Sequence, residues 1–152
     1  MQHVYGTIQP ETLYGVNVDG HALGAIQLAG RKRDWAVEYG GRWHPARDRG
    51  RMPNPRSVLE GLPYVLHYDN YLDLGDGRWL GITRRLTQRR VDFYEVDRER
   101  VVGWMARKTR PFSMPDIEAY LPDYLPPPAI LLLVLGELKV IRAQQQALLS
   151  SS

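Results

Sequence analysis

The most apolar stretch of the chain lies near its C-terminus, directly after three consecutive prolines. Residues 129–136 read Ala-Ile-Leu-Leu-Leu-Val-Leu-Gly, and Glu137 is the first charge that follows. A helix on a protein surface carries polar residues along one face, so a helix over this run must be surrounded by protein on all sides. The pattern predicts a core helix over residues 129–149 that is entered through a proline-rich connection over residues 111–128.

The second half of this predicted helix is amphipathic. Charged and amide residues occur from Glu137 onward, so we expect only the first two turns to be completely buried. The helix would measure about 30 Å, which is near the thickness of a bilayer's hydrocarbon core. A charge near the centre of a spanning helix costs on the order of 3 kcal/mol, so we expect no transmembrane span. In the second half, the positions expected to face inward are Leu138, Val140, Ile141 and Leu148.

Three segments that precede the helix share one hairpin pattern. In each, a short strand is followed by an acidic turn residue, and a glycine lies five or six residues later inside the returning strand. Asp-Gly accepts the positive φ of tight hairpin turns, and a glycine within a strand often marks a bulge or a close backbone approach. Both features suit strongly curved strands such as those of a barrel, although Asp-Gly hairpins also arise by chance. The predicted strands, turn residues and glycines are 14–18, Asp19 and Gly24; 71–74, Asp76 and Gly81; and 93–96, Asp97 and Gly103.

Further strands are predicted where β-branched and aromatic residues concentrate or alternate with polar ones. These strands cover residues 35–39, 78–86, 91–96 and 101–105. The predicted fold class is α+β with mostly antiparallel strands, as a barrel or a strongly curved sheet packed around the hydrophobic C-terminal helix. We expect a single domain over residues 1–152, with its β-rich part over residues 3–110.

Three further segments carry loop, helix or ambiguous signals. Residues 47–55 are polar and interrupted by proline, which predicts a mobile loop between two halves of the domain. Ser57 followed by Glu60 forms a capping-box pattern, which predicts a short helix. Residues 116–121 are compatible with one helical turn or with a strand.

The second half of the chain contains a pattern of strands that ends in an apolar helix. The segments that form it are Tyr94–Asp97, Val101–Lys108, Ile117–Tyr120 and Ile130–Leu135. This pattern resembles the end of the tubby-like superfamily, which includes the tubby C-terminal domain, phospholipid scramblases and LURP-one-related proteins. The resemblance covers residues 71–145, and residues 13–40 through the hairpin pattern alone. It implies a closed antiparallel barrel around a hydrophobic C-terminal helix, whereas the alternative is an unrelated α+β domain whose last helix packs across one sheet.

Composition limits the possible chemistry. The chain has 152 residues, no cysteine and a formal net charge of +3. A domain of this size can bury about two thirds of its unfolded surface without needing disulfides or metals. The absence of cysteine removes disulfides, thiolate nucleophiles and cysteine metal sites. The first residues carry neither the basic segment nor the apolar stretch of a signal peptide, so we expect a cytoplasmic protein.

Basic residues are concentrated in three short clusters, which we expect at hairpin tips. Arginine dominates them, and its planar guanidinium group suits phosphate and carboxylate groups. Such clusters favour binding to an anionic lipid headgroup or to a nucleic acid, through an attraction that weakens with salt. The tubby resemblance favours phosphoinositides, while the alternative is that these arginines are solvated or pair with Asp92, Glu95 and Asp97. The candidate anion-binding residues are Arg84, Arg85, Arg89 and Arg90; Arg31, Lys32 and Arg33; and Arg107, Lys108 and Arg110.

No constellation of residues indicates catalysis. The four histidines are isolated, and the chain has no glycine-rich phosphate loop or nucleophile elbow. Asp69, Asp73 and Asp76 form an oxygen-rich segment that we interpret as a turn-forming acidic loop rather than a calcium site. We therefore predict a non-enzymatic binding protein without a cofactor or a metal. A further alternative is a structural module that self-associates as a homodimer through the end of its helix, residues 147–149.

Overall fold

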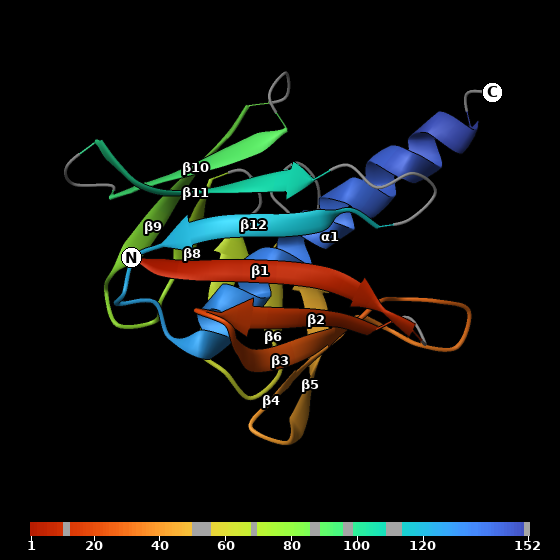
Figure 1. Ribbon diagram of the computed structural model, residues 1–152. Coiled ribbons are helices and arrows are strands. Elements are labelled where there is room, and N and C mark those ends of the chain that lie inside the picture. Colours follow the sequence, from red (N-terminus) through yellow and green to blue (C-terminus); the bar gives the residue numbers. More distant parts are fainter. Residues whose placement is uncertain are drawn as a thin grey trace.

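Twelve antiparallel strands form a closed barrel around one long helix (Figure 1). The computed structural model describes residues 1–10, 13–49, 56–67, 70–85, 89–95, 99–108 and 114–150, and of Arg49 and Arg85 it describes the backbone alone. This architecture confirms the predicted fold class. It also decides between the two predicted forms of the sheet, because the strands close completely.

Each strand pairs with the next one along the chain, and β12 closes the barrel against β1. Closure leaves none of the twelve described strands with an open edge for another chain to pair with. Twelve strands fit within 152 residues because β6, β7 and β8 have only three or four residues each. The strands are β1 Gln2–Gln9, β2 Leu13–Val18, β3 His21–Gln27, β4 Ala36–Tyr39, β5 Arg42–Arg49, β6 Arg56–Leu59, β7 Val65–His67, β8 Tyr71–Asp73, β9 Trp79–Arg85, β10 Arg90–Glu95, β11 Arg100–Lys108 and β12 Asp116–Leu121.

The predicted hairpins join β2 to β3, β8 to β9 and β10 to β11. In the first turn, Asp19 and Gly20 have φ values of 51° and 82°. In the second, Gly77 has a φ of 88°. Both turns thus use the positive φ that tight hairpins require. Asp97, the acidic residue of the third hairpin, lies outside the described residues.

The predicted core helix is present as α1, Pro127–Ser150, which lies inside the barrel (Figure 1). Its residues are buried without interruption from Pro128 to Leu138, so burial continues beyond the two turns expected from the sequence. Val140 is half-buried, and Leu148, which was expected to face inward, is 72% exposed. The reason is that residues 143–150 extend beyond the barrel into solvent.

Two expectations for the middle of the chain are wrong. Residues 47–49 belong to strand β5 rather than to a loop, while residues 50–55 lie outside the described residues. The expected helix at Ser57 is absent because residues 56–59 pair with both β5 and β7. Pairing places Ser57 inside the barrel, where its hydroxyl donates to Asp48 at 2.7 Å. Residues 116–121, for which the sequence left two alternatives, form strand β12.

The three strand glycines lie where another group approaches the backbone closely. A Cβ atom on Gly24 would overlap the carbonyl oxygen of Glu38, and one on Gly103 would overlap the carbonyl oxygen of Tyr120. The strand register also shifts beside both glycines, as it does at a β-bulge. Gly81 differs, because the group closest to it is an aromatic ring of β10 rather than backbone.

Valine substitutions test this interpretation of the glycines. We expect Gly24→Val and Gly103→Val each to lower the free energy of unfolding by about 1–3 kcal/mol, because a neighbouring carbonyl cannot move aside without distorting the sheet. Gly30→Val is the matched control, since a Cβ atom there meets nothing within 4 Å. Urea unfolding of the three variants measures the difference. Equal stability of all three would remove close backbone approach as the reason for Gly24 and Gly103.

Candidate functional site: the basic end of the barrel

All three basic clusters predicted from the sequence belong to the same end of the barrel. Consecutive strands run in opposite directions, so their connections alternate between the two ends. The β3–β4, β9–β10 and β11–β12 connections therefore share the end at which α1 leaves the barrel (Figure 1). We call it the basic end. Its basic residues with described side chains are Arg31, Lys32, Arg33, Arg56, Arg84, Arg89, Arg90, Arg107, Lys108, Lys139 and Arg142.

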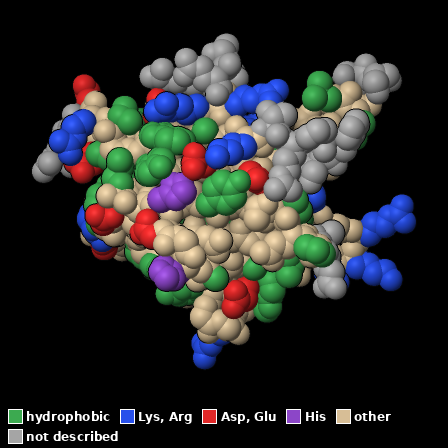
Figure 2. All heavy atoms as spheres, in the orientation of Figure 1, with side chains coloured by type: hydrophobic (Ala, Val, Ile, Leu, Met, Phe, Trp, Pro, Cys, Tyr) green, Lys and Arg blue, Asp and Glu red, His purple; other side chains and the backbone are tan. Residues whose placement is uncertain are grey.

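Acidic residues predominate at the opposite end, where α1 begins. Among the described side chains, the basic residues at this end are Arg42, Arg78 and Arg100. Arg78 forms an ion pair with Asp76 at 2.7 Å. The direction of this charge separation complements the helix dipole, whose positive end lies among the acidic residues. In Figure 2, Lys and Arg side chains project from the right edge of the view, over the β3–β4 connection. The acidic residues of this end are Asp19, Glu38, Glu60, Asp73, Asp76, Glu95, Glu99 and Asp123.

A buried carboxylate marks the point where the helix reaches the basic end. Glu137 is 4% exposed and forms ion pairs with Arg84 of β9 and Arg107 of β11. The Nε of Arg107 donates to Oε1 at 2.8 Å, and the Nη1 of Arg84 donates to Oε2. Each carboxylate oxygen thus has a charged donor, which compensates for the removal of this charge from water. The two ion pairs connect the helix to one side of the barrel.

Lys139 connects the helix to strand β5. Its Nζ donates to the carboxylate of Asp48 at 2.5 Å, and the same carboxylate accepts the hydroxyl of Ser57. Partial burial raises the pKa of Asp48, but the hydrogen bonds from Lys139 and Ser57 outweigh this effect and hold the pKa below its ordinary value. Asp48 is therefore an ionised partner for the helix at neutral pH.

Arg142 forms the third connection between the helix and the barrel. It donates to the carbonyl of Ala29, and its guanidinium carbon lies 5.2 Å from the centre of the Trp35 ring. Successive helix residues are rotated by about 100°, so Lys139 and Arg142 lie on the side of α1 opposite Glu137. We call these three helix residues and their partners the polar collar. It holds the helix from two opposite sides.

Arg84 and Arg107, two of the predicted anion-binding residues, do not project from hairpin tips. Their side chains are each 14% exposed and turn inward to Glu137. Arg107 also donates to Gln144 at 2.7 Å, about two turns further along the helix. The expectation of exposed tips is wrong for these two side chains, because the carboxylate on the helix offers them a buried counter-charge.

Two other candidates are partly engaged on the outer wall of the barrel. Arg90 donates to Asp92 at 2.9 Å and lies over the ring of Trp104. This ion pair confirms the pairing with Asp92 that the sequence left open as an alternative. Lys108 forms a longer ion pair with Glu118 at 3.6 Å. Both cations remain partly exposed, so each can still meet a partner from solvent.

The most accessible of the predicted clusters is residues 31–33, in the β3–β4 connection. Their side chains are exposed, and within the described part of the chain they form no ion pair. Arg89 is also exposed, at a φ of 50°. The side chain of Arg85 and all of Arg110 lie outside the described residues. The anion-binding role of these candidates stays a prediction.

Arg56 is a basic-end residue outside the three clusters predicted from the sequence. It begins β6 and is exposed, close to His67 of the neighbouring strand. Burial lowers the pKa of His67, and the charge of Arg56 lowers it further, so the imidazole is neutral at physiological pH. The proline-rich segment before Arg56 predicts a loop between two halves of the domain, so the sequence does not indicate that Arg56 begins a strand of the barrel.

The helix carries apolar residues beyond the barrel on the same side as the basic clusters. Leu148 and Leu149 are 72% and 76% exposed. Among the described residues, there is no helix with the length and apolar character that crossing a bilayer requires. The basic end thus combines exposed cations with a projecting helix whose last turn includes two leucines.

The acidic residues of the β8–β9 region act as turn formers. Asp73 accepts the backbone N–H of Gly75 at 2.8 Å, and Asp76 accepts that of Arg78 at 3.1 Å. Asp69 lies outside the described residues. Within the ranges that the structure describes, no three His, Asp or Glu side chains lie together as a metal site would need.

Comparison with known proteins provides no relative for this chain: no family model matches it, and neither does a curated protein or a solved structure. The geometry and charge of the basic end are therefore the features from which a function can be inferred.

Removal of the buried carboxylate tests the polar collar. Glu137→Leu removes the buried carboxylate that the largely buried Arg84 and Arg107 both contact, so we expect the free energy of unfolding to fall by about 3–5 kcal/mol. The triple variant Glu137→Leu/Arg84→Met/Arg107→Met should recover most of this loss, because it removes both buried guanidinium groups together with the carboxylate. Urea unfolding measures both effects.

The control for this series is Glu60→Gln, which breaks an exposed ion pair with Arg47. Exposed pairs contribute at most about 1 kcal/mol, so this variant should be nearly as stable as the parent. If Glu137→Leu were as stable as Glu60→Gln, the ion pairs of Glu137 would not anchor the helix.

Proposed function

We propose that this protein is a non-enzymatic binding protein that recognises the phosphate groups of anionic lipid headgroups through its basic end. The observation that carries the proposal is the uneven distribution of charge along the barrel axis. Basic residues outnumber acidic ones at the end with the three basic clusters, although Asp34 is exposed there, and acidic residues predominate at the other end. A protein with this charge separation approaches an anionic surface with the basic end first. We place its action in the cytoplasm, at a membrane leaflet that carries anionic lipids.

Residues 31–33 and Arg56 are the best candidates for direct phosphate contact. They are exposed at the basic end, whereas Arg84 and Arg107 are engaged by Glu137. An arginine side chain can donate two parallel hydrogen bonds to one phosphate group, which gives geometric selectivity as well as charge attraction.

The projecting helix favours a lipid surface over a nucleic acid. Surface binding to a membrane combines basic residues with apolar side chains that enter the headgroup region. Leu148 and Leu149 supply exposed apolar side chains at the basic end. A duplex instead requires a basic surface that follows several phosphates, and a helix projecting from the middle of the basic end interrupts such a surface (Figure 1).

The resemblance to the tubby-like superfamily supports the same proposal. A closed antiparallel barrel around a hydrophobic C-terminal helix is the fold that this resemblance implies. In tubby, basic residues on the barrel surface bind phosphoinositides. We propose a distant relationship to this superfamily, and with it a phosphoinositide as the first lipid to test.

Charge reversal of the exposed cluster tests the proposal. The variant Arg31→Glu/Lys32→Glu/Arg33→Glu should bind at least about a hundredfold more weakly to vesicles containing phosphatidylinositol bisphosphate, because each basic residue near an anionic surface contributes about 1 kcal/mol. Its melting temperature should remain close to that of the parent, because exposed charges contribute little to folding. Co-sedimentation with vesicles over a salt series measures the binding.

Matched controls come from the acidic end and from the helix. Arg42→Glu and Arg100→Glu reverse exposed arginines at the acidic end and should leave vesicle binding unchanged. Leu148→Gln/Leu149→Gln should weaken binding to vesicles without affecting binding to duplex DNA. If the parent attached to neither vesicles nor DNA at low ionic strength, the proposal would be rejected. Stronger binding to duplex DNA than to vesicles would indicate that the basic end recognises a nucleic acid and not a lipid.

A further inference from the structure

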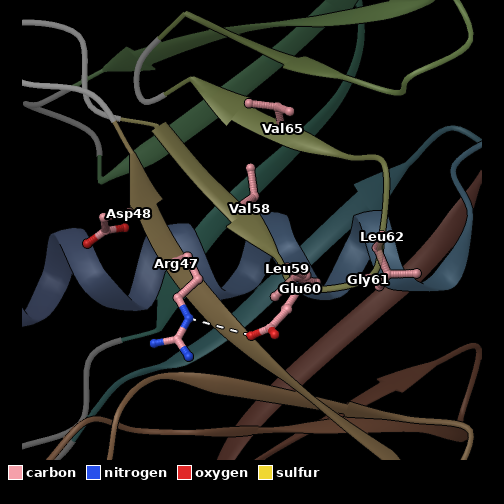
Figure 3. A pocket seen from close by; sticks show the side chains of 8 residues that line it. All are labelled: Arg47, Asp48, Val58, Leu59, Glu60, Gly61, Leu62 and Val65. Carbon is pink, nitrogen blue, oxygen red and sulfur yellow. Dashed lines mark ion pairs between the residues drawn. The ribbon is translucent and has the colours of Figure 1, made fainter.

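A hollow of about 590 Å³ that is open to solvent lies over strands β5, β6 and β7, on the side wall of the barrel (Figure 3). Pockets that hold small molecules typically measure roughly 300–1,000 Å³ and combine apolar walls with a few polar groups. This pocket has both kinds of lining. The residues that line it are Arg47, Asp48, Val58, Leu59, Glu60, Gly61, Leu62 and Val65.

Two opposite charges lie side by side in the pocket. The Nε of Arg47 is 3.5 Å from Oε2 of Glu60, and more than half of each side chain is exposed. Figure 3 shows the two side chains directed toward each other. This ion pair is long and exposed, so its loss costs little and both groups can exchange it for contacts to a ligand. Asp48 also lines the pocket, but its carboxylate is engaged by Lys139 and Ser57.

The rest of the lining is apolar. Val58 and Val65 are partners in the β6–β7 register, and both are half-buried. Leu62, in the connection that follows β6, is also half-buried and packs against the core. An apolar group in this pocket would therefore contact aliphatic side chains that are still partly exposed to water, and their burial would favour binding.

The geometry points to a binding site for a free α-amino acid with a bulky apolar side chain. The ammonium and carboxylate of an α-amino acid are attached to the same carbon, which matches a pocket whose opposite charges lie 3.5 Å apart. Arg47 would receive the carboxylate, Glu60 the ammonium group, and the two valines the side chain. A peptide with free termini fits less well, because it holds its two charges further apart. This site does not depend on the lipid-binding proposal, which concerns the end of the barrel.

Titration of the parent protein with L-phenylalanine tests this inference. The methyl NMR signals of Val58 and Val65 should shift in a saturable way at millimolar concentration. N-acetyl-L-phenylalanine lacks the ammonium group, L-phenylalaninamide lacks the carboxylate, and glycine lacks the apolar side chain. Each should bind about tenfold or more weakly than phenylalanine, since each loses one charge-assisted hydrogen bond or the apolar contact.

Two variants test which charged group of the ligand is bound by Arg47 and which by Glu60. Arg47→Gln should bind phenylalanine and its amide with similar affinity, and Glu60→Gln should bind phenylalanine and its N-acetyl derivative with similar affinity. Arg42→Gln, on the same strand but outside the lining, should behave as the parent. Absence of saturable shifts, or unchanged selectivity in both variants, would overturn the inference. If a variant failed to fold, the four ligands on the parent protein would still decide the outcome.

Discussion

The burial of α1 inside the barrel is the constraint on which the rest of the structure depends. A barrel of about eight strands is filled by its own side chains, so a twelve-stranded barrel leaves space that must be occupied. The helix occupies it with residues 130–135, and each large apolar side chain contributes about 1.5–3 kcal/mol on full burial. Their sum is comparable with the whole net stability of a domain, about 5–15 kcal/mol. Neither the apolar helix nor the wide barrel is therefore expected to persist without the other.

The polar collar defines how far the helix enters the barrel. Glu137 is satisfied where Arg84 and Arg107 meet it, and a shift of the helix by one turn, about 5.4 Å, would separate these groups or bring Lys139 into the apolar interior. The collar also removes two arginines from the surface, whereas residues 31–33, Arg56 and Arg89 of the basic end are exposed. Some basic residues of this end therefore stabilise the position of the helix, whereas others are exposed to solvent.

Local signals in the sequence predict most of the architecture. The apolar run predicts the helix, and Asp-Gly turns with strand glycines predict curved hairpins. Local signals do not predict strand β6. The proline-rich segment before it indicates a loop, and the Ser57 capping pattern indicates a helix. The segment is a strand because it pairs with β5 on one side and with β7 on the other. The inward turn of Arg84 and Arg107 could not be predicted, since Glu137 is 53 and 30 residues away in the chain. Such contacts depend on barrel closure, which no local pattern encodes.

Native-state hydrogen exchange tests most directly the claim that the helix and the barrel form one cooperative unit. The amides of residues 131–138 should exchange only through global unfolding, with the same free energy that urea unfolding gives for the whole protein. The amides of residues 143–150, beyond the barrel, should exchange through local fraying at much lower free energy. If the amides of residues 131–138 exchanged at a lower free energy than those of β11 and β12, the helix would unfold while the barrel remained folded. This result would contradict the claim that the two form one cooperative unit.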